Sequence, residues 1–339
     1  MMMLLVAACG GGGDGGGSGA GPISLGNVPY MNLRGLNGHG SVVVTSYTDT
    51  SNAGVSSGFK ETLAIYRQDT AHPGALLNLG NVFLGVETLY HRLTSLDIND
   101  QWATATINYN DGALGWVSLV SMSGPNYSLA AVLELNQTLD HAVAHDHWLV
   151  VTAGAAAMLY DISKPQSSVL SKTFILSSPT STIVALGDGF LLITDSGYAF
   201  LNPGNATLVE SSNIDIKSSK KAYLVGTNLY IGGPSKYAGK SKVAKLDMSV
   251  PVSPAVTMLN DTVDGELIDF AYDGAGGYFL ATGAQLSGNQ IQMFVESSGA
   301  LTLRQSAPYT SYANAASQFF ASQGIFYTTT SGLGIYKMP

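Results

Sequence analysis

The stretch Leu139–Ile175, LDHAVAHDHWLVVTAGAAAMLYDISKPQSSVLSKTFI, decides the fold. It predicts short strands separated by turns, at Ala142–Ala144, Trp148–Thr152, Ala157–Ile162 and Val169–Ile175. Pro165 stands where the third strand must end, because proline cannot continue a paired ladder. The connections are too short for crossover helices, so we expect the strands to pair as an antiparallel meander.

The same order of strands and turns recurs along nearly the whole chain. Upstream, the expected strands are Thr94–Ile98, Gln101–Asn108, Gly115–Met122 and Ser128–Leu135. Downstream, they are Ile183–Leu186, Phe190–Thr194, Tyr198–Leu201, Thr207–Glu210, Ala222–Val225, Asn228–Gly232, Lys242–Met248, Ala255–Leu259, Leu267–Tyr272, Gly277–Thr282, Gln290–Val295 and Leu301–Gln305. The distance between successive first strands is roughly 40 to 46 residues, which is typical of propeller blades. A four-stranded sheet cannot bury both of its faces alone, so such units should stack around an axis.

The sequence therefore predicts an all-β fold, a seven-bladed β-propeller of four-stranded antiparallel blades, with six or eight blades as alternatives. The first blade, from Tyr30 to about Leu84, is lengthened by a polar insertion at Thr48–Lys60. The last blade has only Ala316–Ala321, Ile325–Thr329 and Gly334–Met338. We expect Ile23–Val28 to supply its fourth strand, which would join the two ends of the chain and remove an exposed sheet edge.

Two segments resemble the LVIVD-type repeat of bacterial surface β-propellers. That repeat ends a strand in an Asp-Ile-Ser-x-Pro-like motif, which stands here in Leu159–Pro165 (LYDISKP) and more loosely in Leu246–Pro251 (LDMSVP). The resemblance implies a propeller at the bacterial cell surface.

The composition excludes some function classes. Apolar residues make up 45% of the chain and charged residues only 11%, with a net charge of −8. No apolar run approaches the ~20 residues that a membrane-spanning helix needs. Lysines gather only at Lys217–Lys221 and Lys236–Lys245, which we interpret as solvated hairpin residues. The basic surface that nucleic acid requires is therefore missing, and we predict no binding to DNA or RNA.

The amino terminus suggests a membrane anchor. Cys9 is the only cysteine, and it follows Val6-Ala7-Ala8. This setting resembles a bacterial lipobox, which implies that residues 1–9 are a truncated lipoprotein signal and that Cys9 is lipidated. Residues 10–21 (GGGGDGGGSGAG) would be a flexible linker, and residues 22–339 the propeller domain. The basic n-region of a signal is missing before Cys9, which leaves open a start upstream of Met1. In bacterial lipoproteins, the absence of Asp directly after the lipidated cysteine favours the outer membrane, and Gly10 follows Cys9 here.

Candidate metal sites can be explained by turn chemistry. His141, His145 and His147 share strand parity, and imidazoles with nearby carboxylates suit zinc, copper or nickel. However, a turn near residues 145–147 would break their alignment, so we predict no metal and no cofactor. Acidic, glycine-rich turns that could suggest calcium occur at Asn108–Gly112, Asn260–Gly265 and Asp273–Gly277. Tight hairpins need the same residues for positive φ.

No enzyme signature is present, and we identify no catalytic residue. The Gly-x-Ser-x-Gly pattern occurs at Gly54–Gly58 (GVSSG), but it lies in the polar insertion, and the fold expected here lacks the strand-to-helix turn that a nucleophile elbow requires. The chain has no Cys-x-x-Cys-His haem motif. A carboxylate pair for glycoside cleavage remains an alternative, because several aspartates could approach one another around the axis, although they could equally cap turns of the inner strands. These are Asp97, Asp140, Asp188 and Asp269. Trp102, Trp116 and Trp148 are interpreted as packing between blades.

The leading hypothesis is a lipid-anchored envelope propeller that acts as a non-enzymatic scaffold for protein partners. The alternative is an envelope hydrolase or lyase acting on a carbohydrate or lactone. Convergent acidic side chains with raised carboxyl pKa values in the channel would favour the enzyme, and a channel lined by Ser, Thr and Gly would favour the binding module. A third hypothesis is a subunit of a larger surface assembly, which an exposed apolar patch would indicate.

Overall fold

The structure, a computed structural model, describes most of the chain beyond the amino-terminal segment. The described residues are 23–28, 33–49, 60–69, 71–72, 74–87, 91–124, 126–213, 215–284, 288–308, 319–329 and 333–337. Cys9, the glycine-rich linker and most of the insertion expected at Thr48–Lys60 lie outside them. Among the described residues, no helix is long and apolar enough to cross a membrane.

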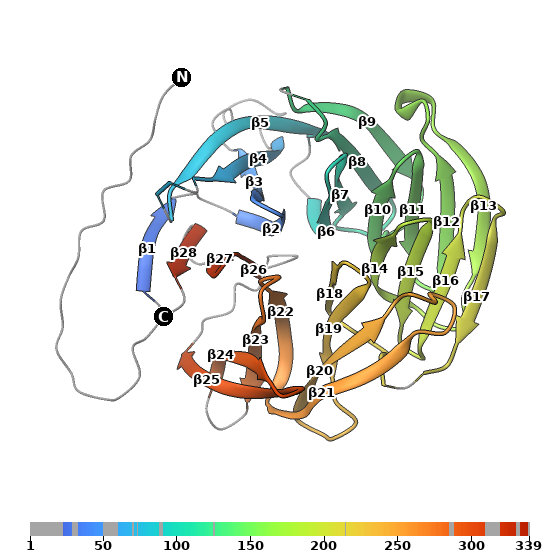
Figure 1. Cartoon of the computed structure of the whole chain (residues 1–339). Helices are drawn as coiled ribbons and strands as arrows, with labels where there is room; N and C mark the ends of the chain where they lie inside the picture. The colour runs from blue at the N-terminus through green and yellow to red at the C-terminus, as the bar shows by residue number, and fades with distance from the viewer. Residues whose placement is uncertain are drawn as a thin grey trace.

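Seven four-stranded antiparallel sheets form a ring around a central axis (Figure 1), which confirms the predicted fold. Blade 1 contains β2 (Leu33–His39), β3 (Val42–Asp49), β4 (Lys60–Gln68) and β5 (Leu76–Glu87). Blade 2 contains β6 (His91–Ile98), β7 (Trp102–Tyr109), β8 (Gly115–Ser121) and β9 (Ser128–Leu135). Blade 3 contains β10 (His141–His145), β11 (Trp148–Ala153), β12 (Ala156–Asp161) and β13 (Val169–Ile175), with the 3-10 turn η1 (Pro165–Ser167) before its last strand.

The remaining blades repeat this arrangement. Blade 4 contains β14 (Thr180–Leu186), β15 (Gly189–Thr194), β16 (Tyr198–Asn202) and β17 (Thr207–Ser211). Blade 5 contains β18 (Lys221–Val225), β19 (Asn228–Pro234), β20 (Lys240–Asp247) and β21 (Ala255–Asp264). Blade 6 contains β22 (Glu266–Tyr272), β23 (Gly277–Ala284), β24 (Gly288–Ser297) and β25 (Ala300–Pro308).

Blade 7 closes the ring with strands from both ends of the chain. It contains β26 (Phe319–Ser322), β27 (Ile325–Thr329) and β28 (Leu333–Lys337), and β1 (Ile23–Val28) completes it. The strand order is β1-β28-β27-β26, with Ile23 opposite Lys337 and Val28 opposite Leu333. The predicted closure by the amino-terminal strand is thus confirmed. It covers the outer edge of β28, which would otherwise be open to another chain.

The hydrophobic core is divided among the junctions between blades. The buried apolar residues form seven clusters in the described part of the chain, and each cluster joins two neighbouring blades. For example, Val143 and Leu159 of blade 3 pack with Phe190 and Leu192 of blade 4. Trp148 packs against this cluster, Trp116 against the one between blades 1 and 2, and Trp102 against the one between blades 2 and 3. The predicted packing role of the tryptophans is therefore confirmed.

Candidate functional site: the central channel

The first strands of the blades surround a central cavity. Its volume is about 630 Å³, and β2, β6, β10, β14 and β18 supply most of its lining. These inner strands contact their neighbours around the ring, and Figure 1 shows them facing the central opening. Cavities of roughly 300 to 1,000 Å³ are the usual size for ligand sites. We therefore take the central channel as the candidate functional site.

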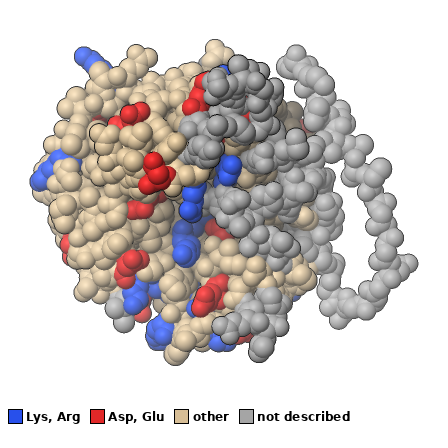
Figure 2. Space-filling model, turned by 180° about the vertical axis from the view of Figure 1, so that it is seen from behind, with Lys and Arg blue, Asp and Glu red and all other residues tan. Residues whose placement is uncertain are grey.

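The two mouths of the channel differ in charge. The first strand of every blade runs in the same direction along the axis, so residues after these strands lie at one mouth and residues before them at the other. Asp100 and Asp146 follow β6 and β10, and both line the cavity. We call this end the acidic mouth. Lys220 and Lys221, at the start of β18, mark the basic mouth. Figure 2 shows basic side chains leading into a hollow near the middle of one face.

Asp269 and Lys221 connect three inner strands. The Asp269 carboxylate accepts hydrogen bonds from the amides of Phe270 (2.7 Å) and Phe319 (3.0 Å). The Lys221 ammonium donates to the carbonyl oxygen of Phe319. Burial lowers the pKa of Lys221, while the negative charges of Asp269 and Asp97 act in the opposite direction. These contacts fasten β18, β22 and β26 together, so Asp269 and Lys221 stabilise the ring as well as line the channel.

Asp97 lies on β6, on the other side of the central opening from β18 (Figure 1). Burial raises the pKa of its carboxyl group to about 7, although the backbone amide of Ile98 and the charge of Lys221 partly oppose the rise. Desolvation disfavours the charged form of a carboxyl group, which explains the direction. At neutral pH, Asp97 can therefore donate as well as accept a hydrogen bond.

The structure separates the four aspartates that were candidates for a carboxylate pair. Asp97 and Asp269 line the channel, as expected for two members of the set. Asp140 instead accepts a hydrogen bond from the amide of Gly154 at 2.6 Å, and Asp188 is exposed in the turn between β14 and β15. Asp140 therefore caps a turn, and Asp188 lies outside the channel lining. Of the four candidates, only Asp97 and Asp269 line the channel, and Asp140 follows the alternative expectation that these aspartates cap turns.

The histidine cluster is divided by a turn, as predicted. His145 pairs with Trp148 in the ladder between β10 and β11, so Asp146 and His147 form the turn between the strands. His145 Nε2 lies 3.8 Å from the Asp146 carboxylate, and the ring of His147 lies 4.8 Å from that of Trp148. No group of three or more metal-ligating side chains is assembled within the described residues.

Two of the three acidic, glycine-rich segments have the geometry of tight turns. The Asp273 carboxylate accepts hydrogen bonds from the amides of Ala275 (2.7 Å) and Gly277 (2.8 Å). Asp111 accepts from Ala113 at 2.9 Å, and the neighbouring Gly112 has a φ of 76°. These two carboxylates thus cap local amides, as turn chemistry predicts. At Asn260–Gly265 the prediction of a tight turn is wrong, because residues 260–264 belong to β21 and only Gly265 connects it to β22.

The lysine-rich stretches are not uniformly solvated, which corrects the prediction from sequence. Lys242 is only 3% exposed. Burial lowers its pKa to about 8. The negative charge of Asp215 acts against this shift, and the positive charge of Lys217 adds to it. Lys221 lines the channel instead of extending into solvent. The sequence offered one signal for Lys221, since it directly precedes the apolar residues of a first strand. The prediction from sequence took all of Lys217–Lys221 as solvated hairpin residues and therefore missed the place of Lys221 in the channel.

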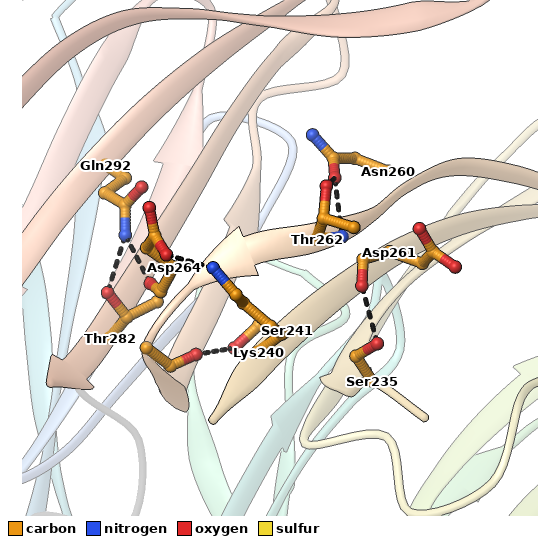
Figure 3. Close-up of polar contacts among 10 residues, drawn as sticks. Ser235, Lys240, Ser241, Asn260, Asp261, Thr262, Asp264, Thr282 and Gln292 are labelled. Carbon is orange, nitrogen blue, oxygen red and sulfur yellow. Dashed lines mark hydrogen bonds and ion pairs between the residues drawn. The ribbon is translucent and has the colours of Figure 1, made fainter. Parts of the chain in front are cut away.

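The other lysine stretch stabilises the junction between blades 5 and 6 (Figure 3). Lys240 forms an ion pair with Asp264, and Gln292 donates to the carbonyl of Asp264 and to the hydroxyl of Thr282, both at 2.7 Å. A single residue, Gly265, connects β21 to β22 with a φ of 92°. The hydroxyl of Ser241 donates to its carbonyl at 2.6 Å. This network fixes a very short connection, and we assign it a structural role.

At the end of blade 5 beside the acidic mouth, exposed aliphatic side chains lie at the end of β18 and in the turn between β20 and β21. The set, which we call the blade-5 patch, consists of Leu224 (38% exposed), Val225 (41%), Val250 (53%) and Val252 (44%). The amide of Met248 donates to the carbonyl of Thr227 at 2.8 Å and holds this turn to the one between β18 and β19. Leu224 also lines the cavity, so the patch is continuous with the channel.

Comparisons with known proteins agree with the fold. No family model matches the sequence, and no curated protein matches it. The structure is similar to a chain of the mitotic checkpoint complex (TM-score 0.59, 12% identity, 98% of each chain covered). It is also similar to the Neurospora crassa Pan2 WD40 domain (TM-score 0.58, 10% identity, 94% of this chain and 95% of that chain). The WD40 propeller domain of Doa1 gives a TM-score of 0.55 at 12% identity, covering 94% and 97%. At these identities the likeness shows the fold alone: the chain is a seven-bladed β-propeller with the architecture of WD40 domains.

Proposed function

We propose that this propeller is a non-enzymatic binding module that docks a protein partner on the face around the acidic mouth. The observation that carries the proposal is the blade-5 patch, whose four aliphatic side chains are between 38% and 53% exposed at the end of β18 and in the turn after β20. Exposed apolar groups that cluster beside polar ones are typical of interaction sites, whereas scattered ones are ordinary. Loops held by a rigid scaffold are also the usual place for binding residues.

The fold supports this proposal by analogy. Similar propellers include a chain of the mitotic checkpoint complex, which is by its description a protein assembly. Fold alone does not determine function, so the proposal depends on the patch and the channel mouth of this chain.

We further propose that the protein is a lipoprotein of the bacterial envelope, anchored in the outer membrane through Cys9. The support is the lipobox-like Val6-Ala7-Ala8-Cys9, the glycine-rich residues 10–21, and the LVIVD-like segment Leu159–Pro165. Expression of the full chain in a bacterial host should place it in the membrane fraction. Cys9→Ser should release it to the soluble fraction, and mass spectrometry should find acyl chains on the parent only. An unmodified Cys9 in a membrane-bound chain would contradict the anchor.

The docking proposal can be tested by capture from detergent-solubilised envelopes. We expect the full chain to retain a stoichiometric protein partner, and Val225→Ser with Val250→Ser to lower its recovery at least tenfold. Leu303→Ser is the matched control, because Leu303 is 50% exposed on the outer strand of blade 6, away from the patch. Equal loss with the control, or full retention with the patch variant, would count against this face.

One observation favours the enzymatic alternative, a hydrolase or lyase on a carbohydrate or lactone. The Asp97 carboxyl group has a pKa raised to about 7 in the channel, as a general acid near neutral pH would need. The Asp269 carboxylate is engaged by two backbone amides, which argues against its use as the second carboxylate of a pair. Hydrolysis of a chromogenic glycoside or of a lactone that disappears in Asp97→Asn would establish this alternative over the binding module.

A further inference from the structure

We propose that the acidic mouth receives a lysine or arginine side chain of the partner that covers the blade-5 patch. This inference rests on the proposed docking function and adds the chemistry of the partner: an apolar segment with one basic residue. The geometry that points to it is the position of Asp97, Asp100 and Asp146, which all line the cavity at or just inside one mouth.

The acidic groups of this mouth differ in depth. Asp100 lies 3.4 Å from His39 Nε2 and Asp146 lies 3.8 Å from His145 Nε2, and both imidazoles also line the cavity. The side chains of Asp100 and Asp146 are 90% and 56% exposed, so water screens each of them strongly. Asp97 lies further inside, on β6, where burial makes ionisation unfavourable even though the charge of Lys221 partly opposes this effect. A cation that reaches Asp97 would restore its ionised form and pair with it in a less polar environment. Asp97 should therefore contribute most to recognition, and the two exposed aspartates should attract the cation toward the opening.

The opposite end of the channel fixes the direction of entry. Lys220 and Lys221 lie at the basic mouth, and Lys217 and Lys242 lie close to each other beside it. A basic side chain entering there would meet like charge. A basic side chain that enters from the acidic mouth would instead meet three carboxyl groups before it approached Lys221. The negative charge of Asp269 partly offsets the positive charge of Lys221.

The aliphatic wall continues from the patch into the channel. Leu224 belongs to both, and Leu186 and Val184 of the neighbouring first strand also line the cavity. The methylene groups of a lysine or arginine side chain can pack on such a wall while the charged group reaches the carboxylate. The site is therefore complementary to a long basic side chain flanked by apolar residues. It fits an acidic or phosphorylated segment poorly, because such a segment would bring like charge to the mouth.

The experiment uses two synthetic peptides, acetyl-Leu-Leu-Arg-Leu-amide and the same peptide with citrulline, the neutral isostere of arginine. Binding to the full chain is measured by isothermal titration calorimetry at low and physiological salt. We expect the arginine peptide to bind at least tenfold more tightly than the citrulline peptide. Asp97→Asn should remove most of this preference, and Asp100→Asn with Asp146→Asn should reduce it two- to threefold. Val225→Ser with Val250→Ser should weaken both peptides equally.

The controls separate this inference from the function on which it rests. Asp188→Asn removes an exposed carboxylate outside the cavity lining and should leave the preference unchanged, and thermal unfolding of each variant confirms that it folds. Equal binding of the two peptides, a preference that survives Asp97→Asn, or binding of neither peptide would overturn the inference. The docking function would still stand if the envelope capture succeeded and depended on the blade-5 patch. If the docking function were wrong, the envelope capture would show no loss specific to the blade-5 patch, independently of the peptide titrations.

Discussion

The carboxylate of Asp269 accepts a hydrogen bond from the amide of Phe319 at 3.0 Å, and so joins the first strand of blade 6 to the first strand of blade 7. The same carboxylate accepts from Phe270 at 2.7 Å. Lys221 of blade 5 donates to the carbonyl of Phe319, so three successive blades meet at one point of the channel wall. The charged groups of the channel are thus part of the closure of the ring.

Asp269→Ala should lower the free energy of unfolding by about 2 to 4 kcal/mol, because it leaves two amides without their acceptor and removes a negative charge near the Lys221 ammonium. Asp269→Asn keeps one carbonyl acceptor and should lose about half as much. Urea unfolding measures both, with Asp188→Asn in an exposed turn as the control. A loss for Asp269→Ala within about 0.5 kcal/mol of that control would show that the contact with Phe319 does not stabilise the ring.

Asp97 predicts a specific dependence of stability on pH. Its pKa is raised from 3.8 to about 7 in the folded chain. Below pH 4 the carboxyl group is protonated in both states. Between pH 4 and 7 the native state holds a proton that the unfolded state has released, so the free energy of unfolding falls as pH rises, by at most about 1.4 kcal/mol per pH unit. Above the folded pKa this contribution is constant and unfavourable.

Asp97→Asn should remove this fall. The variant should gain stability relative to the parent as pH rises from 4 to 7, and the difference should level off above pH 7. Urea unfolding at several pH values between 4 and 9 measures the difference, in which contributions from other titrating groups cancel. A constant difference across this range would mean that Asp97 has an ordinary pKa in the folded chain.

The strand repeat made the architecture predictable because each strand is short and apolar and ends in turn chemistry. Val169–Ile175 and Ile325–Thr329 have the predicted bounds, and Ile23–Val28 fills the place in blade 7 that the repeat left vacant. That last prediction needed no side-chain detail. A three-stranded final unit leaves an edge that only a strand from elsewhere in the chain can cover.

The channel could be predicted only in part. Asp97 and Asp269 stand inside expected first strands, and both line the channel. Asp140 and Asp188 stand just outside expected first strands, and the structure places Asp140 at a turn amide and Asp188 in an exposed turn. The strand pattern therefore separated the two pairs, but it could not show which side chains of a first strand reach the cavity, since the register of each blade around the axis decides that. Lys242 was misread for a similar reason. Lys242 is 3% exposed, and its side chain and Ser219, which precedes β18, both lie beside Gly233 of β19, a tertiary contact that the local sequence does not show.

Glu61 and His91 form a buried polar contact between blades 1 and 2, and its removal should destabilise the protein. His91 Nε2 lies 2.8 Å from the Glu61 carboxylate, and their side chains are 3% and 0% exposed, respectively. Ser46 and Thr48 also donate to Glu61. Glu61→Ala should therefore cost about 3 to 5 kcal/mol, as expected when one partner of a buried network is removed.

The neighbouring residue supplies a matched control. Lys60 forms an ion pair with Glu87 at 2.9 Å, but both side chains are more than a third exposed. Lys60→Ala should cost less than about 1 kcal/mol, because exposed pairs are screened by water. Thermal and urea unfolding of the two variants measure the contrast. Similar losses for both would mean that burial does not determine the contribution of the Glu61 carboxylate.

Closure by β1 should be required for a monomeric, stable ring. β1 pairs with β28 at five positions from Ile23–Lys337 to Val28–Leu333. Removing residues 1–28 should lower the free energy of unfolding by roughly 3 to 5 kcal/mol, at about 1 kcal/mol for each backbone hydrogen bond lost. It should also expose the edge of β28, which can then pair with another chain. Removing only residues 1–21 leaves β1 in place and is the control. We expect the shorter deletion to unfold like the parent and to run as a monomer in light scattering, and the longer one to unfold earlier and to self-associate. If both deletions behaved alike, the pairing of β1 with β28 would be dispensable, and the stability of the ring would come from the apolar clusters between its blades.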